Sequence, residues 1–491
     1  MPRVIVVGGG PAGSTAATLL AKAGVSVTLF ERETFPRYHI GESLTISCRG
    51  ILDYLGAFDK VEEKGFLKKA GALMRWGDDP DWVIDWTAQF GRDMRSWQVD
   101  RAEFDNVLLD HAREHGAEVI EGARVRKVVF DGDRAIGVNW TADGSDEERL
   151  ATADLVLDAS GRAGLISSQH LGNRRMHEIF RNVAIWGYWQ GGELLPGSPE
   201  NGINVIDSPD GWYWVIPLRD GKFSVGFVAH QSVFQERRKE FATLDDMLLR
   251  LVEESPTVTE ILKAGSFASG ARVEQDFSYV ADSFCGPGYF LLGDAACFLD
   301  PLLSTGVHLA MYSGLLSAAC AAALGQGDVS EHEAQGFYES LFRNAYVRLF
   351  TLVSGFYQKN AGKARYFALA ETLTREETVR ERSDVPFGEV ISGLTDLREA
   401  SAEDGRGARP IGEVIADAAA TKPAVGELLE AVEQAHRRAH AESGTRKRSR
   451  RDTDIDANDL YDVATGLYLT LVPRLGIGSA RAAATTASAR D

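Results

Sequence analysis

The sequence predicts an α/β fold in which a parallel sheet is joined to a second, sheet-rich domain and a helical C-terminal region. Three observations support this prediction. Residues 4–30 show a strand–helix–strand pattern with a glycine-rich turn after the first strand. Residues 180–230 are rich in strand patterns with aromatic pairs and short Gly-containing turns. A strand at 289–292, followed by an apolar helix at 303–323, then returns the chain to the first sheet.

Length and composition exclude several classes of protein. The chain has 491 residues, 44% hydrophobic and 25% charged, which is typical of a soluble globular protein rather than a disordered one. Its net charge of −18 disfavours binding to nucleic acid. None of the four cysteines forms a Cys-x-x-Cys pair, so neither a metal site nor a disulfide framework is predicted. With no export signal at its start, the chain is expected in the cytoplasm.

The first strand, helix and strand carry a dinucleotide-binding pattern. Residues 4–7 are wholly apolar, as in a strand buried on both faces. Gly8, Gly10 and Gly13 follow, and such glycines allow a tight turn, close approach of a pyrophosphate and packing of helix on strand. Glu31 ends the second strand, where a carboxylate accepts hydrogen bonds from a ribose. The residues expected to hold the cofactor here are Gly8, Gly10, Ala12, Gly13, Glu31 and Arg32.

The remaining elements are predicted from periodicity. Residues 101–117 have one apolar face and are expected to form a helix, residues 123–158 a β-meander, and residues 331–384 further helices. Residues 306–325 contain no charged residue and could span a bilayer by length, but His308 and several serines favour a buried core helix. The basic run at 446–451 is expected in a solvated loop, and the low-complexity tail at 482–491 is expected to be mobile.

Three later signals favour FAD over NAD as the dinucleotide. Asp294 follows Gly293 at the end of a strand late in the chain, where its carboxylate can reach a ribityl hydroxyl of a flavin. The segment 158–162 and a helix start at Arg101 accompany it. With the glycine-rich turn, these motifs resemble the FAD-containing aromatic hydroxylase superfamily. The resemblance implies that Arg101, Gly293 and Asp294 contact the cofactor.

Two further motifs narrow the resemblance to the flavin-dependent halogenases. Residues 35–44, Phe-Pro-Arg-Tyr-His-Ile-Gly-Glu-Ser-Leu, are similar to the segment that these enzymes carry after the first βαβ unit. Residues 211–217, Gly-Trp-Tyr-Trp-Val-Ile-Pro, match their Trp-x-Trp-x-Ile-Pro signature. The similarity covers roughly residues 2–350. By this resemblance the residues expected to line the active site are His39, Glu42, Ser43, Trp212, Trp214 and Pro301.

The resemblance also implies a catalytic lysine and a halide site. Residues 65–71 resemble the lysine loop of the halogenases, and the Lys-x-Gly register identifies Lys69 rather than Lys68. A desolvated lysine can lose its proton and react with hypohalous acid. In the family, the loop at residues 300–308 holds a halide through backbone N–H groups, which places the ion near Thr305 and Gly306. Tryptophan-chlorinating relatives carry a glutamate where this chain has Leu303, which favours phenols or carrier-tethered aromatics as substrates.

The expected architecture is therefore a Rossmann-like FAD-binding domain, a β-sheet substrate domain and a helical C-terminal region. The boundaries expected are 1–175 and 275–350 for the FAD-binding domain, 176–274 for the substrate domain and 351–491 for the C-terminal region with its tail. The resemblance implies halogenation, most readily chlorination, of an electron-rich aromatic natural-product precursor through hypohalous acid and Lys69. It needs FAD supplied in reduced form, O2, and chloride or bromide. An NAD(P)H flavin reductase and an aromatic substrate, free or on an acyl carrier, are the expected partners, with neither nucleic acid nor a membrane.

Three other functions fit the same scaffold. An FAD-dependent aromatic monooxygenase would share the fold and the cofactor but be largely indifferent to loss of Lys69. An alkene-reducing flavoprotein of the same superfamily is another possibility. A non-catalytic binding protein that kept the scaffold is disfavoured by the intact Gly8, Gly10, Gly13, Glu31 and Asp294.

Overall fold

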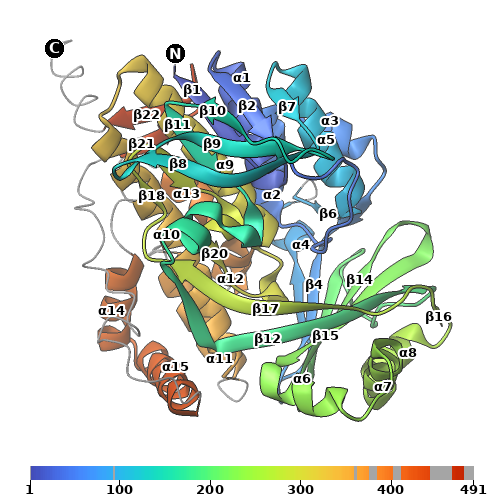
Figure 1. Ribbon diagram of the computed structural model, residues 1–491. Helices are drawn as coiled ribbons and strands as arrows, with labels where there is room; N and C mark the ends of the chain where they lie inside the picture. Colours follow the sequence, from blue (N-terminus) through green and yellow to red (C-terminus); the bar gives the residue numbers. More distant parts are fainter. Residues whose placement is uncertain are drawn as a thin grey trace.

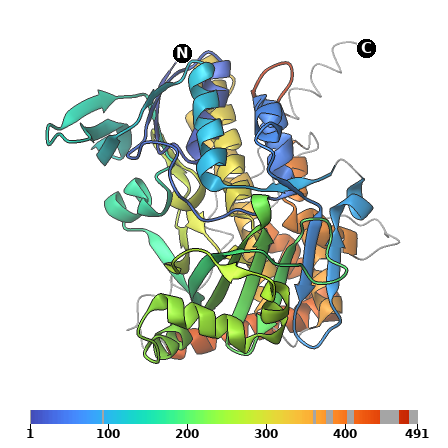
Figure 2. The ribbon, with the colours of Figure 1, turned by 90° about the vertical axis from the view of Figure 1, so that its right-hand side faces the viewer.

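The computed structural model describes residues 2–91, 94–358, 362–374, 384–401, 411–442 and 467–479. Two large sheets organise this part of the chain (Figure 1). The parallel sheet lies near the N-terminus with α1 and α5, and the second sheet extends away from it toward α6, α7 and α8 (Figures 1 and 2). The bounds of these helices are α1 Pro11–Lys22, α5 Arg101–Glu114, α6 Gln231–Arg238, α7 Leu244–Glu254 and α8 Pro256–Leu262.

The first sheet has the predicted parallel core. Its order is β18-β19-β11-β1-β2-β7, and only the β18–β19 pair is antiparallel. The strands are β1 Arg3–Val7, β2 Ser26–Phe30, β7 Glu118–Ile120, β11 Leu155–Asp158, β18 Cys285–Gly286 and β19 Tyr289–Leu291. Four residues of β1 are buried, as expected of a strand covered on both faces. The strands β1, β2, β11 and β19 end on one edge, where a ligand of such a sheet binds.

The second sheet is larger than the interval 176–274 predicted for it. Its order is β20-β17-β12-β15-β14-β13-β4-β5, with β16 paired to β12. The strands are β4 Gly71–Arg75, β5 Trp82–Asp85, β12 Arg174–Gln190, β13 Ile203–Ser208, β14 Gly211–Pro217, β15 Lys222–His230, β16 Ser266–Phe267, β17 Arg272–Ala281 and β20 Cys297–Phe298. Strands β4, β5 and β20 come from the intervals assigned to the FAD-binding domain. They join here because β4 pairs in parallel with β13 and β20 pairs with β17.

The predicted meander at 123–158 is only partly correct. Strands β8 Ala123–Asp131, β9 Arg134–Ala142 and β10 Arg149–Thr152 form the antiparallel meander. Residues 155–158 do not close it, because β11 pairs in parallel with β1 at the centre of the first sheet. The wholly buried, apolar start of β11 fits a central strand better than the edge of a meander.

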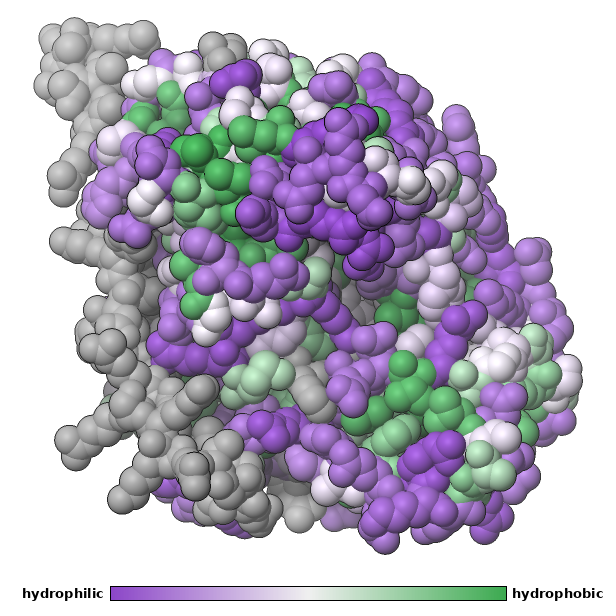
Figure 3. Space-filling view, in the orientation of Figure 1, coloured by the Kyte–Doolittle hydropathy of each residue, from purple (hydrophilic) through white to green (hydrophobic). Residues whose placement is uncertain are grey.

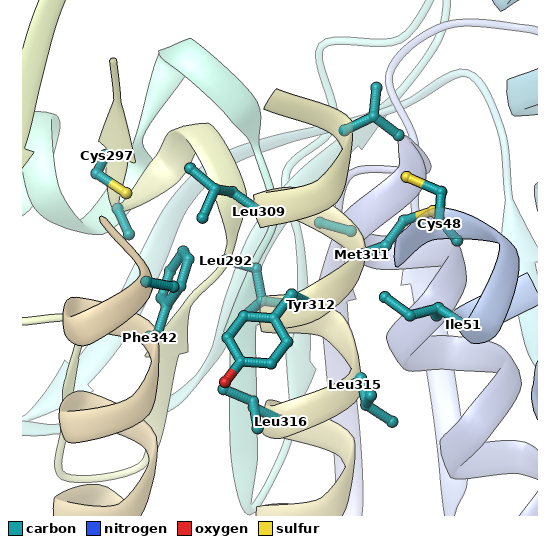
Figure 4. Packing of buried hydrophobic residues seen from close by; sticks show 14 of the residues in the cluster. Cys48, Ile51, Leu292, Cys297, Leu309, Met311, Tyr312, Leu315, Leu316 and Phe342 are labelled. Atoms are coloured by element: carbon teal, nitrogen blue, oxygen red, sulfur yellow. The ribbon is translucent and has the colours of Figure 1, made fainter. Parts of the chain in front are cut away.

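The apolar stretch after residue 305 forms the helix α9 Gly306–Gln326, which lies inside the protein. By length and composition it could cross a membrane, yet most of its residues are buried in the fold. Figure 4 shows α9 between α2 Ile46–Leu55 and α10 Glu331–Phe356, with Met311, Leu315 and Leu316 among the packed side chains. The approach to α1 is close, because a Cβ on Gly314 would lie 2.6 Å from the carbonyl oxygen of Ala12. The predicted core helix is confirmed.

The described part of the C-terminal region is mostly helical, and it also contains a hairpin that the sequence did not predict. The helices are α11 Lys363–Leu373, α12 Asp384–Ile391, α13 Leu394–Ala400, α14 Ile411–Thr421 and α15 Pro423–Glu442. The hairpin consists of β21 Leu467–Thr470 and β22 Gly476–Ser479. The basic run 446–451 and the tail 482–491 lie outside the described residues. The face drawn in Figure 3 is mainly hydrophilic with scattered apolar patches.

Candidate active site

The glycine-rich turn lies at the ligand-binding edge of the parallel sheet. Gly8 has φ +106°, and a Cβ there would lie 2.3 Å from the carbonyl oxygen of Ala159. A Cβ on Gly13 would lie 1.9 Å from the carbonyl oxygen of Gly8. A Cβ on Gly10 meets only the guanidinium end of Arg37, at 3.6 Å. The first and third glycines are therefore required by packing, whereas Gly10 faces space that a pyrophosphate can enter.

Glu31 lies at the end of β2 and holds the same turn. Its Oε2 accepts a hydrogen bond from the backbone N–H of Gly9 at 2.6 Å, and its Oε1 accepts one from the N–H of Glu33 at 2.8 Å. Arg32 points to the surface, where it pairs with Glu33. Ala12 is buried at the start of α1, and a Cβ on Gly293 would lie 3.7 Å from the Cβ of Ala12. The glycine-rich turn at 8–13 and the Gly293–Asp294 motif therefore lie next to each other at the start of α1.

The late acidic residue Asp294 fits a ligand hydroxyl. Within the described part of the chain, no hydrogen bond reaches its carboxylate, while its backbone carbonyl accepts one from Tyr279. Burial raises the pKa of Asp294, against the charges of Arg162, Arg101 and Arg174. A half-buried carboxylate with free lone pairs is the acceptor that a ribityl hydroxyl needs. Asp158, in contrast, is occupied by the backbone N–H groups of the turn that follows it.

Arg101 is held by the protein itself. At the first turn of α5 its guanidinium forms two hydrogen bonds to Asp105, at 2.8 and 3.0 Å, and donates a third to the carbonyl of Ile40 at 2.8 Å. Through these contacts Arg101 therefore fixes the backbone of the segment that carries Glu42 and Ser43.

Lys69 is buried at the end of β3 Leu67–Lys69, which pairs with β6 Ser96–Gln98. Its side chain is 2% exposed, and Nζ donates hydrogen bonds to Ser43 Oγ at 2.7 Å and to the carbonyl of Leu44 at 3.2 Å. Nζ also lies 4.7 Å from the ring centroid of Trp86. No carboxylate among the described residues forms an ion pair with it.

Burial has a direct consequence for the chemistry of this amine. The lost hydration lowers the pKa of Lys69 to about 7, with Cys48 acting weakly in the opposite direction. A large fraction of the side chain is therefore neutral near physiological pH, and a neutral amine has a lone pair for an electrophile. The two adjacent lysines differ, since Lys68 is exposed and paired with Glu62 at 2.6 Å. Alternation along β3 thus supports the register that selects Lys69.

The turn before α9 combines strain with open space. Ser304 has φ +58°, a left-handed conformation that is uncommon outside glycine. Thr305 is buried at the N-cap, whereas Gly306 is exposed, and a Cβ on Gly306 would meet no heavy atom within 4 Å. Pro301 begins the short helix Pro301–Leu303, capped by the side chain of Asp300. The amides at the start of α9 can therefore receive an anion.

The tryptophans of the 211–217 motif lie on one face of β14. Both are buried and belong to the hydrophobic core that contains the parallel sheet. Their indole N–H groups are occupied, because Trp212 donates to Tyr357 Oη at 3.0 Å and Trp214 donates to Ser224 Oγ at 3.2 Å. Tyr357 in turn donates to Asp300 at 2.9 Å, which connects this face to the turn before α9.

Glu42 points to the second sheet and His39 to the surface. Tyr188 donates a hydrogen bond to Glu42 Oε1 at 2.6 Å, and its hydroxyl is 2.9 Å from that of Tyr38. Burial raises the pKa of Glu42 despite the hydrogen bonds from Tyr188 and Ser224. His39 is exposed, with Nδ1 2.6 Å from the carbonyl oxygen of Ile40. The segment 38–43 thus contacts the second sheet through Tyr38 and Glu42 and helix α5 through Ile40.

Several residues that shape the site were not predicted. Trp86 covers the Lys69 amine, Tyr188 holds Glu42, and Tyr357 joins Trp212 to Asp300. Each comes from a segment without a motif, and only its aromatic character distinguishes it in the sequence. Within the described residues no group of three His, Cys, Asp or Glu side chains gathers as a metal ion would require.

Comparisons with known proteins agree with this geometry. The model of the tryptophan halogenase family matches residues 3–96 and 87–386. A tryptophan 2-halogenase of Chondromyces crocatus is 42% identical over 405 residues, which cover 81% of this chain and 77% of that protein. A flavin-dependent halogenase of Acremonium egyptiacum is 35% identical over 377 residues, 72% of this chain and 68% of that protein.

Solved structures show the same relationship. The myxobacterial chondrochloren halogenase CndH superposes with a TM-score of 0.69 at 35% identity, covering 81% of this chain and 91% of that one. The flavin-dependent halogenase CmlS superposes with a TM-score of 0.70 at 30% identity, covering 81% and 78%. The halogenase resemblance is confirmed over the alternative functions. The chain belongs to the tryptophan halogenase family and is a flavin-dependent halogenase, an oxidoreductase that uses FAD, O2 and halide to act on an aromatic substrate with a separate flavin reductase.

Proposed function

We propose that this halogenase chlorinates an electron-rich, phenolic natural-product precursor and that Lys69 transfers the halogen. The observation that supports this most directly is the burial of Lys69, which leaves its amine without a carboxylate partner in the described structure and lowers its pKa to about 7. A solvated lysine would be protonated and would not react with an electrophile.

The cofactor would lie along the edge formed by the ends of β1, β2, β11 and β19. Gly8, Gly10 and Gly13 would admit its pyrophosphate, Glu31 would accept from the adenosine ribose, and Asp294 would accept from the ribityl chain. Bound in reduced form, FAD supplies with O2 the two-electron oxidation that converts chloride to hypochlorous acid. The protein keeps this oxidation away from the aromatic ring.

Chloride would bind at Thr305 and Gly306. The open space around Gly306 and the amide groups at the start of α9 support this position. Ser304 holds the turn in a left-handed conformation just before these residues. Pro301 and Asp300 would fix the approach to this turn from the other side.

Lys69 would then carry the chlorine to the substrate in two balanced steps. The neutral amine attacks the chlorine of hypochlorous acid, so an N–Cl bond forms, the Cl–O bond breaks, and the lost N–H proton leaves with hydroxide as water. The aromatic ring next attacks this chlorine, so a C–Cl bond forms, the electron pair of the N–Cl bond returns to nitrogen, and the ring proton restores the amine. Ser43 and Leu44 would hold Nζ in place during both steps.

The substrate class is inferred from Leu303. This residue is buried where tryptophan-chlorinating relatives carry a glutamate, so no carboxylate from this position can assist an indole. A phenol activates its own ring toward electrophiles and does not need that assistance. The similarity to a tryptophan 2-halogenase makes free tryptophan the competing substrate to be tested. Trp212, Trp214, His39 and Glu42 would border the substrate space between the two sheets.

The proposal is tested by incubating the FAD-loaded protein with a flavin reductase, NADH, air and sodium chloride. The substrates are a panel of free phenols, the same phenols as carrier-protein thioesters, and free tryptophan. Mass spectrometry reports the gain of chlorine or of oxygen. We expect chlorinated phenols, and the comparison of free with tethered substrates identifies the form that the enzyme accepts.

Two outcomes would contradict the proposal. Chlorinated tryptophan with unchanged phenols would overturn the substrate class. Products that gain oxygen alone would overturn halogenation by this chain. Omitting chloride from a parallel incubation provides the control, because no halogenated product can then form.

A further inference from the structure

A continuous chain of buried hydrogen bonds connects α2, α9 and α13. Ser47 Oγ on α2 lies 2.8 Å from His308 Nδ1 on α9, and His308 Nε2 lies 2.7 Å from Asp396 Oδ2 on α13. The three side chains are at most 1% exposed. Arg348 on α10 completes the chain through an ion pair with Asp396. None of these contacts has a part in the halogenation steps proposed above.

Counting donors and acceptors gives the chain a direction. The Asp396 carboxylate, paired with Arg348, can only accept, so His308 Nε2 carries the proton and donates. Burial and the Arg348 charge lower the pKa of His308 to about 3, so the ring is neutral and Nδ1 accepts from the Ser47 hydroxyl. Thr45 Oγ1, 2.9 Å from Ser47 Oγ, then donates to it. Every ring nitrogen and hydroxyl in the chain is therefore satisfied in one arrangement.

One end of this hydrogen-bond chain, at Thr45, lies beside the residues that bind the Lys69 amine. Thr45 directly follows Ser43 and Leu44, the two residues that accept from Lys69 Nζ. The carbonyl of Thr45 accepts from the Ser96 hydroxyl at 2.9 Å, and Ser96 is the residue of β6 paired with Lys69. Thr45 thus connects the backbone around the Lys69 amine to the hydroxyl of Ser47.

The middle of this hydrogen-bond chain lies at the start of α9. His308 is in the first turn of this helix, three residues after Thr305. Tyr312, one turn later, stacks on His308 with 5.6 Å between ring centroids, and its hydroxyl donates to the carbonyl of Asp396 at 3.3 Å. The position of the first turn of α9 therefore depends on α13, an element beyond residue 350 that no motif identifies.

The arrangement resembles a nucleophilic triad, but it cannot act as one. A Cβ on Gly393 would lie 2.6 Å from Ser47 Oγ and 2.7 Å from the His308 ring, so no substrate atom fits beside the hydroxyl. Its complete burial and its fully paired atoms indicate a structural linkage between two parts of the site.

We propose that Ser47, His308 and Asp396 are positioning residues that set the start of α9, and with it the halide position, relative to the amine of Lys69. The inference rests on the proposed function, since it takes the halide and lysine sites from there. A displacement of about 1 Å between reacting groups lowers rates on the order of 100-fold, so a linkage of this kind controls how efficiently an oxidised halogen reaches the amine.

Two variants interrupt the chain at the same point by different routes. Ser47→Ala removes the hydroxyl that donates to Nδ1. His308→Gln keeps a group that can reach Asp396 but removes the ring acceptor of Ser47. The matched controls are Ser317→Ala, a buried serine of α9 whose hydroxyl bonds to Gly314 of the same helix, and His111→Gln, a buried histidine of α5 bonded to the carbonyl of Leu55.

The first readout needs no turnover. Sodium chloride is titrated against sodium gluconate at constant ionic strength into the oxidised, FAD-loaded protein, and the flavin difference spectrum gives the chloride affinity. The second readout is the amount of chlorinated product per flavin oxidised. We expect both test variants to bind FAD as the controls do, to bind chloride on the order of 10-fold more weakly, and to release more oxidant without product.

The outcomes separate this inference from the proposed function. Test variants that match their controls in chloride affinity and in product per flavin would overturn the inference while the wild-type chlorination stands. A wild-type protein that shows neither a chloride-dependent spectrum nor chlorination would overturn the proposed function and the inference with it. Equal loss in Ser47→Ala and Ser317→Ala would also overturn the inference, because it would show general destabilisation of α9.

Discussion

Lys68 and Lys69 are adjacent in the chain, yet their amines lie in opposite environments. Lys69 Nζ donates to Ser43 Oγ at 2.7 Å inside the protein, whereas Lys68 Nζ pairs with Glu62 at 2.6 Å on the surface. The alternation of a strand separates them, because successive side chains point to opposite faces. The pair provides a matched comparison for the function of the lysine loop.

We therefore expect Lys69→Met to abolish chlorination and Lys68→Met to leave it within about twofold of wild type, since only Lys69 can present a neutral amine to the oxidised halogen. Flavin oxidation by O2 should continue in both variants. Product formation is measured by mass spectrometry and flavin oxidation by absorbance. Chlorination that survives in Lys69→Met at the wild-type rate would contradict the role of this amine.

The activity should depend on pH through the same amine. The pKa of about 7 means that raising the pH from 6 to 8 increases the neutral fraction of Lys69 by about tenfold. Chlorination under single turnover should rise over this range with a midpoint near pH 7. Flavin oxidation, followed in the same samples, serves as the reference. A chlorination rate that falls as pH rises would exclude the neutral amine as the reacting form.

Stability should show the corresponding linkage. Above pH 7 the folded protein has lost the Lys69 proton, whereas the unfolded chain keeps it up to the ordinary pKa of 10.5. The unfolded state then binds more protons, so the free energy of unfolding rises with pH by about 1.4 kcal/mol per pH unit from this residue. Urea denaturation of wild type and Lys69→Met between pH 7.5 and 9 measures it as a difference. Parallel curves would disprove the shift.

The glycine-rich turn offers a test that separates cofactor binding from folding. Gly13→Ala places a Cβ 1.9 Å from the carbonyl oxygen of Gly8, so we expect loss of folded protein. Gly10→Ala meets nothing nearer than 3.6 Å, so the fold should survive while FAD affinity falls by about tenfold, or ~1.4 kcal/mol. Thermal unfolding and FAD titration distinguish the two. Wild-type FAD affinity in Gly10→Ala would show that the pyrophosphate does not approach there.

The buried ion pairs of Arg348 with Asp396 and Glu399 should contribute strongly to the free energy of unfolding. Arg348 pairs with Asp396 and Glu399, and Arg348→Met leaves both carboxylates without this partner. Loss of a buried ion-pair partner costs about 3–5 kcal/mol. The comparison is Arg437→Met, whose pair with Glu433 is exposed and should cost less than about 1 kcal/mol. Urea denaturation gives both values, and a similar cost for the two would argue against a stabilising role for Arg348.

The sequence motifs predicted those features of the fold that depend on residues close together in the chain. The glycine spacing and the apolar runs predicted the strand–turn–helix start of the parallel sheet, because turns and buried strands depend on neighbouring residues. The Lys-x-Gly register selected Lys69, and the structure buries this side chain while Lys68 is exposed, as alternation along a strand allows. The buried apolar helix α9 followed from its composition together with the polar His308 within it.

Long-range pairing was not predictable in the same way. Strand β4 follows Lys69 in sequence but joins β13, more than 120 residues later, and no local pattern records that choice. The residues around Asp396 have no motif, so their contact with His308 depends on tertiary packing alone. The interval 176–274 omits β4 and β5 because they pair with the second sheet from a distant part of the sequence.

The entry of β4 and β5 into the second sheet has a consequence for engineering. A chimera that exchanged the second sheet between halogenases could be cut at the apparent domain borders. In this chain such a cut at 176–274 would leave β13 without its neighbour β4 and expose an unpaired strand edge to aggregation. A graft that keeps the sheet whole must carry residues 71–85, all of β12 and β17, and β20 as well. Its first junction then falls immediately after Lys69 and Ala70.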